Sequence, residues 1–290
     1  MSAPIGIFDS GLGGLSVWKE VVKLLPGRCI VYVSDNGYCP YGPRPAEEVV
    51  ERTKTISRFL IREGCAVVVV ACNTATAAAI DILRNTFPVP FVGMEPAVKP
   101  AALHSHTGVV GVLATHGTFR GRLYQETSQR FASHVHIMEQ VGDGLVELIE
   151  KGVADAPETL RLLRTYIEPM MEAGADHLVL GCTHYPFLIP AIQQIVQGRM
   201  TIIDPAPAVA QHLCTLLTAT DPAPAVAQHL CTLLTATDLQ ATGPDPSSVS
   251  AHTPLVYRFF ATGSAATLEV CYRSISPPSI PAQFNSYVVL

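Results

Sequence analysis

The chain has 290 residues, of which 48% are hydrophobic, and a formal net charge of −5 at pH 7. This length and composition allow one large or two ordinary domains with a sizeable buried core. With only 19 lysines and arginines and no basic stripe, the chain is not expected to bind nucleic acid.

The N-terminal sequence MSAPIGIFDSG lacks the basic and apolar regions of a secretory signal, and no run of about eighteen apolar residues occurs. We therefore expect a cytoplasmic protein that does not enter a membrane. The eight cysteines show neither a C-x-x-C pair nor the compact spacing of a disulfide scaffold. We expect them to be free thiols.

Short apolar segments rich in β-formers alternate with longer helical stretches along the chain. Nine such segments predict strands, at residues 5–9, 29–34, 66–71, 90–94, 109–115, 134–138, 177–181, 200–204 and 257–262. The alternation predicts an α/β fold with mostly parallel sheets and right-handed crossovers. Because nine strands would strain one compact sheet of this length, two α/β domains are expected.

The predicted division gives residues 1–95 and 206–290 to the first domain and residues 96–205 to the second. The first break is placed at EPAVKPAAL (95–103), where two prolines interrupt the pattern after a strand. The strand at 200–204 leads toward a final strand and helices, so the C-terminal quarter is expected to complete the first domain.

Ligands of open parallel sheets bind at the carboxyl ends of the strands. Five segments at such ends are rich in glycine or polar residues: GIFDSGLGG (6–14), SDNGYCPYG (34–42), VVVVACNTATAA (67–78), VLATHGT (112–118) and HLVLGCTHYP (177–186). In two of them a cysteine follows the strand, Cys72 in the first domain and Cys182 in the second. This pseudo-symmetry predicts two thiols that face each other across an interdomain cleft.

Two opposed thiols can invert a stereocentre. One thiolate removes a proton from a carbon acid, and the opposite thiol delivers a proton to the other face. The Cα proton of an amino acid is far less acidic than a thiol, whose ordinary pKa is about 8.5, so the site must stabilise the carbanion. The side chains suited to binding a carboxylate, together with N–H groups at helix N-termini, are those of Ser10, Asn73, Thr74 and Thr183. Asp9 and His184 can each relay a thiol proton, one on each side of the cleft.

The same residues have other interpretations. A buried cysteine is usually a small core residue, but the matching contexts of Cys72 and Cys182 favour a functional pair. DSGLGG lacks the G-x-G-x-x-G and G-K-[ST] patterns, so nucleotide binding is weakly supported. Cys182 and His184 can ligate a metal, but alternate positions at a strand end point to opposite faces. With no other Cys/His cluster evident, we expect no metal.

The motifs GIFDSGLGGLSV, PYG, ACNTAT and GCTHYP, in this order and spacing, closely resemble those of the cofactor-independent glutamate racemases, in the aspartate/glutamate racemase family. The resemblance covers residues 5 to about 205 and resumes with FFATGSA near 260. It implies an isomerase that interconverts L- and D-glutamate for the synthesis of cell-wall peptidoglycan. It also implies a homodimer with no pyridoxal phosphate, metal or other cofactor.

The resemblance implies roles for particular residues. Cys72 acts on the D-enantiomer with Asp9 assisting it, and Cys182 acts on the L-enantiomer with His184 assisting it. The residues implied to contact glutamate are Asp9, Ser10, Tyr41, Gly42, Asn73, Thr74, Thr183 and His184. Glu150, in LVELIEKG, matches a supporting glutamate near the active-site histidine, although the preceding VGDG departs from the family's usual residues.

Two other hypotheses stay open at this point. One is a racemase or decarboxylase of the same superfamily that acts on another acid. The other is a thiol protein that binds a metal or senses redox state.

The sequence DPAPAVAQHLCTLLTAT occurs twice in tandem, at residues 204–220 and 221–237. Each copy predicts one amphipathic helix with an aspartate N-cap, and the apolar stripe of the first copy is Val209, Leu213, Leu216 and Leu217. The rest of the chain shows no such period, which excludes a solenoid. We expect copy one to dock on the first domain and copy two to form an added surface helix.

Overall fold

The computed structural model describes residues 3–131, 134–220, 257–276 and 282–286. Its strands are β1 (Ile5–Asp9), β2 (Ile30–Ser34), β3 (Val67–Val70), β4 (Phe91–Gly93), β5 (Val109–Ala114), β6 (His136–Val141), β7 (His177–Gly181), β8 (Thr201–Ile203), β9 (Tyr257–Ala261) and β10 (Ala282–Ser286). Its helices are α1 (Leu15–Leu24), α2 (Ala46–Arg62), α3 (Asn73–Thr86), α4 (Val98–His104), α5 (His116–Phe119), α6 (Arg122–Phe131), α7 (Leu145–Glu150), α8 (Pro157–Glu172), the 3-10 helix η1 (Tyr185–Leu188), α9 (Ile189–Val196), α10 (Ala206–Thr220) and α12 (Ala265–Ile275).

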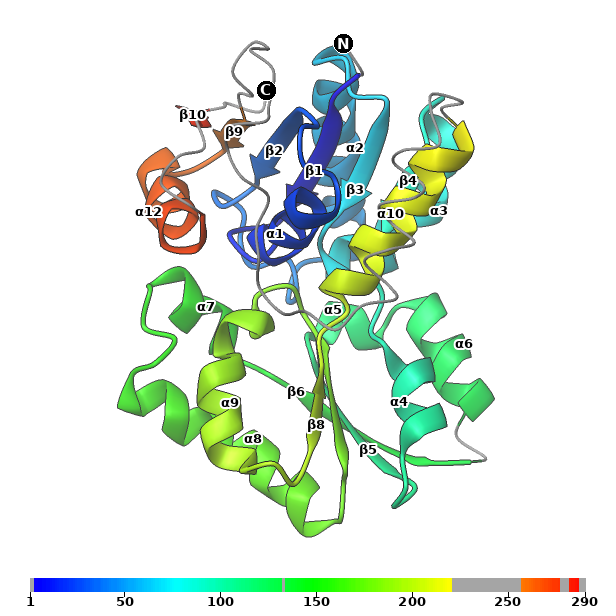
Figure 1. Ribbon diagram of the computed structural model, residues 1–290, viewed down its shortest axis with the longest axis vertical. Helices are drawn as coiled ribbons and strands as arrows, with labels where there is room; N and C mark the ends of the chain where they lie inside the picture. The colour runs from blue at the N-terminus through cyan, green and yellow to red at the C-terminus, as the bar shows by residue number, and fades with distance from the viewer. Residues whose placement is uncertain (1–2, 132–133, 221–256, 277–281, 287–290) are drawn as a thin grey trace, which may run out of the picture.

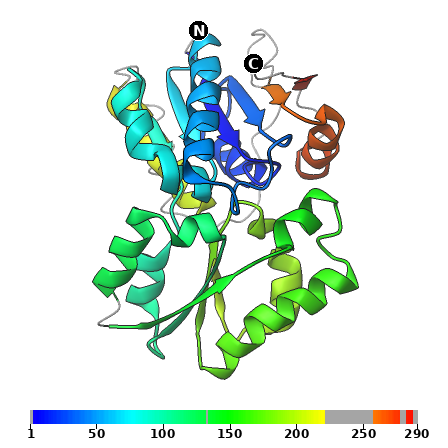
Figure 2. The same ribbon diagram turned by 180° about the vertical axis from the view of Figure 1, so that it is seen from behind.

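These strands form two sheets, which occupy separate halves of the molecule (Figures 1 and 2). One sheet has six strands in the order β10-β9-β2-β1-β3-β4, and the other has four in the order β6-β5-β7-β8. The strand pairs in both sheets are parallel. The predicted fold class, α/β with two mostly parallel sheets, is therefore confirmed.

Helices cover both faces of the six-stranded sheet. On one face, Ile5 and Ile7 of β1 pack with α1, α10 and α12. On the other face, Phe8 of the same strand packs with α2 and α3. Because successive side chains of a strand point to opposite faces, a sheet covered on both sides needs strands that are apolar throughout. This explains the continuous apolar runs in the sequence.

The four-stranded sheet is built in the same way. Leu178 and Leu180 of β7 pack with α7, α8 and α9, while Val179 between them packs with α4 and α6. Each half of the molecule therefore has a helix–sheet–helix sandwich with its own core.

Apart from ends that differ by one residue, the predicted strands differ from the observed ones in two places. β6 covers His136–Val141 rather than 134–138, and β10, at Ala282–Ser286, was not predicted. Both are edge strands. An edge strand is not enclosed on all sides and does not need a continuous apolar run, so its sequence signal is weak.

The six-stranded sheet takes strands from both ends of the chain, and the four-stranded sheet takes strands from its middle. The domain boundaries at 95/96 and 205/206 stay predictions.

The first copy of the tandem repeat forms α10, which lies beside the six-stranded sheet in Figure 1. The Asp204 carboxylate accepts a hydrogen bond of 2.9 Å from the Ala206 N–H at the helix start. Val209 and Leu213 are buried in the core that contains α1. The second copy, residues 221–237, lies outside the described residues.

Among the described residues, no helix combines the length and the hydrophobicity that crossing a bilayer requires.

Candidate active site

One cavity between the two halves is lined by residues that follow the strands. It is lined by Ser10, Pro40, Tyr41, Gly42, Cys72, Asn73, Thr74, Thr115, Val146, Cys182, Thr183 and His184. Of the residues predicted for the site, only Asp9 and Glu150 do not line it, and both are hydrogen-bonded to residues that do. The cavity has a volume of about 10 Å³, roughly the room that one water molecule needs. The carboxyl ends of the two sheets therefore meet at one small cavity.

Cys72 lies between β3 and α3 and is the N-cap residue of that helix. Its sulfur accepts the Ala75 N–H at 3.5 Å, and it lies 3.7 Å from the Ser10 hydroxyl oxygen. Burial, followed by the negative charge of Asp9, raises the pKa of the Cys72 thiol well above its usual value. The helix N-terminus opposes this shift without reversing it, so Cys72 carries its proton near neutral pH.

Asp9 ends β1 and is fully buried. Its carboxylate accepts the Gly11 N–H at 3.0 Å and the Thr183 hydroxyl at 3.2 Å, so it connects the two halves. Burial raises the pKa of Asp9, while the nearby His184 opposes the rise. A carboxyl group with a raised pKa is suited to exchanging a proton with its surroundings.

His184 lies between a thiol and a carboxylate. Its Nδ1 is 3.8 Å from the Cys182 sulfur, and its Nε2 is 2.6 Å from Glu150 Oε1. Burial alone would lower the pKa of His184, but hydrogen bonds to cysteine sulfurs and to Glu150 outweigh burial and raise the pKa well above its usual value. The same contact lowers the pKa of Glu150 against the effect of burial. The pair is therefore an imidazolium beside a carboxylate.

Cys182 and His184 do not point to opposite faces, so this prediction is wrong. β7 ends at Gly181, and the chain turns before η1, so strand alternation no longer applies. The sulfur and the imidazole converge on the cavity instead.

The glycine-rich turn after β1 allows residues of the other half to come close. A Cβ atom on Gly13 would lie 2.3 Å from His184 Nδ1, and one on Gly11 would lie 2.1 Å from Glu150 Oε1. The backbone N–H of Leu12 donates to Glu150 Oε1 at 2.7 Å. Glycine is needed at both positions because the turn packs directly on the His184–Glu150 pair.

Polar side chains complete the lining. Asn73 donates from Nδ2 to the Met94 carbonyl at 3.4 Å, while its Oδ1 is buried without a partner among the described residues. The hydroxyls of Thr74 and Thr115 lie 2.8 Å apart across the two halves. The Tyr41 hydroxyl donates to Asp35. Asn73 thus offers an unused acceptor to a ligand.

Four residues at the site were not predicted. Pro40, Thr115 and Val146 line the cavity, and the Cys39 sulfur lies 3.7 Å from Glu150 Oε1. Thr115 and Cys39 lie in VLATHGT and SDNGYCPYG, two strand-end segments rich in glycine or polar residues. This composition could have identified them. Val146 lies on α7 within LVELIEKG, where only Glu150 was singled out.

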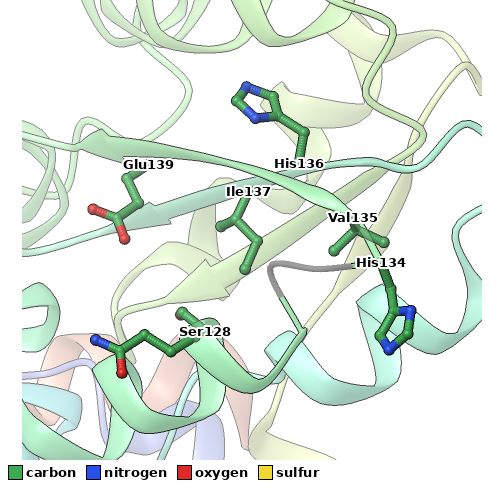
Figure 3. Close-up of a pocket in the computed structure, with 7 residues that line it drawn as sticks. Ser128, His134, Val135, His136, Ile137 and Glu139 are labelled. Carbon is green, nitrogen blue, oxygen red and sulfur yellow. The ribbon is translucent and has the colours of Figure 1, made fainter.

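A larger hollow of about 530 Å³ lies along the edge strand β6 (Figure 3). Its lining residues are Ser128, Gln129, His134, Val135, His136, Ile137 and Glu139. None of these is a predicted site residue, and the hollow contains no thiol. The small cavity with two thiols is the better candidate for chemistry.

Known proteins resemble this chain in sequence. The family model described as Asp/Glu/Hydantoin racemase matches residues 5–213. The glutamate racemase of Roseiflexus sp. (strain RS-1) is 52% identical over 206 residues, which are 71% of this chain and 76% of that protein.

Solved structures resemble it in fold. Glutamate racemase isoform RacE1 from Bacillus anthracis has a TM-score of 0.78 and 28% identity, covering 97% of this chain and 96% of its own. Escherichia coli glutamate racemase, solved in complex with L-glutamate and the activator UDP-MurNAc-ala, has a TM-score of 0.77 and 30% identity, covering 100% of both chains. The resemblance drawn from the motifs is confirmed, and the chain belongs to the Asp/Glu/Hydantoin racemase family of isomerases.

Proposed function

We propose that the chain is a glutamate racemase that interconverts the two enantiomers by proton transfer between Cα and two thiols. The observation that carries the proposal is that Cys72 and Cys182, one from each half, line a single cavity. The named relatives, which are glutamate racemases, support glutamate as the substrate.

In the proposed reaction, L-glutamate loses its Cα proton to the Cys182 thiolate, which leaves a carbanion and a Cys182 thiol. The Cys72 thiol then gives its proton to the opposite face of Cα and becomes the thiolate, so that D-glutamate forms. The reverse reaction starts from the Cys72 thiolate. After each turnover the two thiols exchange protons with solvent, with Asp9 as the relay near Cys72 and His184 as the relay near Cys182.

The carbanion must be stabilised, and this site does so without a lysine or arginine among its described lining residues. Their only positively charged side chain is the His184 imidazolium. The first N–H groups of α3, which begins at Asn73, are available to the substrate carboxylate. The free Oδ1 of Asn73 is proposed to accept from the substrate ammonium group, which keeps that group positioned beside Cα.

Substrate entry requires the two halves to separate. A cavity of about 10 Å³ cannot hold glutamate, so the Thr74–Thr115 and Asp9–Thr183 contacts across the halves must break and form again during turnover. Closure then excludes water from the carbanion.

The test follows L-glutamate and D-glutamate separately in D₂O by NMR and circular dichroism. Each enantiomer should give the other with deuterium at Cα, and the remaining substrate should stay unlabelled at early times, because the removed and delivered protons belong to different thiols. Exchange with aspartate but not with glutamate would mean that the enzyme acts on another acid. No exchange with any acidic amino acid would refute a racemase.

Single variants test the pair of bases. C72S and C182S should each lower racemisation by about a thousandfold or more in both directions. C29S is the matched control, because Cys29 is a half-buried free thiol away from the cavity and its loss should leave activity unchanged. Full activity in either C72S or C182S would rule out the two-thiol mechanism.

The biological setting belongs to the same proposal: a cytoplasmic homodimer that supplies D-glutamate for peptidoglycan. Expression of the chain should restore growth of a bacterium that requires added D-glutamate, and C72S should not. Light scattering of the purified protein should give the mass of two chains, and the mass of one chain would contradict the homodimer.

A further inference from the structure

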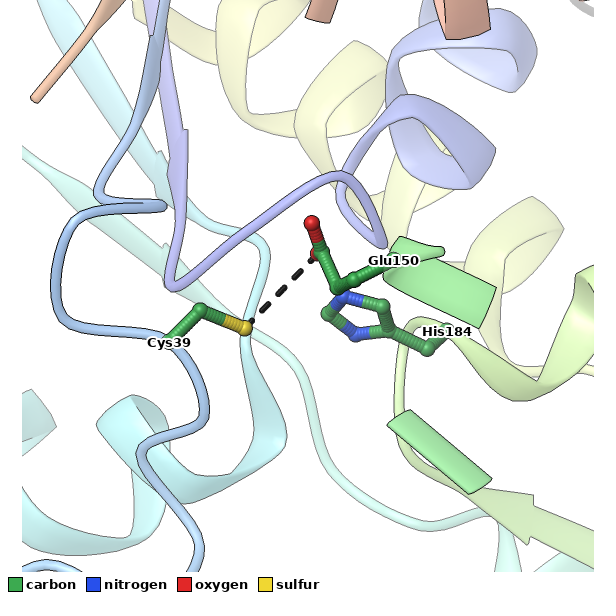
Figure 4. A group of neighbouring side chains, drawn as sticks. All are labelled: Cys39, Glu150 and His184. Atoms are coloured by element: carbon green, nitrogen blue, oxygen red, sulfur yellow. Dashed lines mark hydrogen bonds and ion pairs between the residues drawn. The ribbon is translucent and has the colours of Figure 1, made fainter. Parts of the chain in front are cut away.

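A third thiol, that of Cys39, lies beside the His184–Glu150 pair. Cys39, Glu150 and His184 each present one potential metal ligand, and these atoms lie within 4.8 Å of one another. Figure 4 shows Cys39 extending from a loop of one half toward Glu150 and His184 of the other. A thiol, an imidazole and a carboxylate are the ligand types that zinc takes in proteins.

The spacing of the three atoms is close to that of a tetrahedral site. Zinc–ligand lengths of about 2.0 to 2.3 Å place neighbouring ligand atoms roughly 3.3 to 3.6 Å apart. The Cys39 sulfur is 3.7 Å from Glu150 Oε1, about 0.1 Å beyond this range. His184 Nε2 is 2.6 Å from the same oxygen and must move away by less than about 1 Å.

Two of the three side chains are partly exposed to solvent, whereas the His184 side chain is 1% exposed. Cys39 is half-buried, and the Glu150 side chain is 18% exposed. The Leu12 N–H, which donates to Glu150 at 2.7 Å, fixes the carboxylate in the manner of an outer-sphere partner. Water can fill the fourth position.

The ligands come from both halves of the molecule. Cys39 lies in the loop between β2 and α2, whereas Glu150 ends α7 and His184 follows β7. A cation bound by all three would therefore join the halves across the cleft that must open for substrate. It would also engage the imidazole that faces Cys182 at 3.8 Å.

We propose that Cys39, Glu150 and His184 form an inhibitory site for a thiophilic divalent cation such as Zn²⁺, which holds the cleft closed. Binding releases the proton of the Cys39 thiol and the proton of His184 Nε2 to solvent. These costs make the site weaker than a structural zinc site, so occupancy follows the free zinc concentration.

The metal site is tested apart from the reaction. Cys39 does not line the cavity, but its sulfur contacts Glu150 and the His184 imidazole, so C39S is compared by metal binding rather than by its racemase rate. The competing possibility is that zinc binds the two thiols in the cavity, and this possibility predicts that C39S binds zinc as well as the original protein does.

The first test measures metal binding without any assay of racemisation. Co²⁺ is added to the full chain, and the sulfur-to-cobalt charge-transfer absorption in the near ultraviolet is followed. The band should appear in the original protein, in the control C29S and in the C72S/C182S double variant. It should weaken in C39S, with affinity lower by at least about tenfold. An unchanged band in C39S would overturn the proposal.

The second test uses zinc itself. Because Zn²⁺ would bind the folded chain at this site, it should raise the melting temperature of the original protein in a concentration-dependent way, with a smaller rise in C39S. Zinc should inhibit racemisation, and the inhibiting concentration should increase by at least about tenfold in C39S. Equal inhibition of both proteins would place the metal elsewhere. If no racemisation were found, the cobalt band and the melting temperature would still decide the metal site.

Discussion

His184 Nε2 lies 2.6 Å from Glu150 Oε1, while Nδ1 of the same ring lies 3.8 Å from the Cys182 sulfur. This arrangement makes Glu150 a positioning residue, because it acts on the reacting thiol through the imidazole. It also gives Glu150 an electrostatic role, since its carboxylate helps to keep the imidazole protonated.

Replacing Glu150 with glutamine should lower kcat/KM by about tenfold or more. The two enantiomers have equal free energy, so the decrease must be the same in both directions. The pKa of His184 should fall when the carboxylate is lost, and the basic limb of the pH–rate profile should move to lower pH. Rates measured by circular dichroism from pH 6 to pH 10 check this.

Two further variants separate positioning from folding. E150D should recover part of the activity and of the pH profile, and E147Q, on the exposed side of the same helix, should match the original protein. A profile in E150Q that is lower but not shifted would leave Glu150 with a structural role only.

Replacing Gly13 with alanine should disable the site while the fold persists. The new Cβ would lie 2.3 Å from His184 Nδ1 and 2.7 Å from the His184 backbone nitrogen, and a backbone atom cannot move aside cheaply. A misplacement of this kind is expected to cost about a hundredfold in kcat, with about 1 to 3 kcal/mol of stability lost to overpacking.

The control for this variant is G27A. Gly27 has φ of +93° and no neighbour within 4 Å of an added Cβ, so alanine there costs about 1 kcal/mol of backbone strain and touches no site residue. Urea unfolding and initial rates are measured for both variants. Comparable activity in G13A and G27A would mean that the turn does not hold His184.

The pH dependence of stability should include a contribution from Asp176, the residue before β7. Burial would raise its pKa, but hydrogen bonds from His177, the Ser105 hydroxyl and the N–H groups of His106 and Thr107 lower it well below the usual value. A lowered folded-state pKa stabilises the protein above the unfolded value of about 3.9, and this stabilisation is lost as pH falls toward the folded value.

D176N should therefore be less stable by about 1 kcal/mol at pH 7, a modest figure because solvent reaches the carboxylate. Its unfolding free energy should also fall less steeply between pH 5 and pH 3, so that the two curves converge in acid. Urea unfolding at several pH values measures this, with the exposed D155N as control. Parallel curves for D176N and the original protein would contradict the assignment.

The sequence predicts which residues carry the chemistry of the site better than it predicts how those residues contact one another. Cys72 and Cys182 could be paired because each follows a parallel strand at the carboxyl edge of its own sheet, where ligands bind, and this is a property of the fold class. The cluster of Cys39 with Glu150 and His184 could not be predicted, because it depends on how a loop of one half meets a helix end of the other. The relation of Cys182 to His184 was misjudged because strand geometry was extended past the strand end at Gly181.

The tandem repeat supplies its own matched pair of variants. Leu213 in α10 is fully buried in the core with α1, and Leu230 is the same residue of the second copy. L213A should lower the free energy of unfolding by about 2 to 5 kcal/mol, because it removes buried methyl groups and leaves a cavity. L230A should lower it by much less if the first copy is the one that completes the core.

Urea unfolding of the two variants, side by side, decides between the copies because the local sequences are identical. A larger loss in L230A would mean that the second copy takes the position of α10 in solution. Equal small losses would mean that either copy can replace the other in the core, and the double variant L213A/L230A should then lose the full amount. The comparison tests the position of α10 without any change of length, which a deletion of residues 221–237 would introduce.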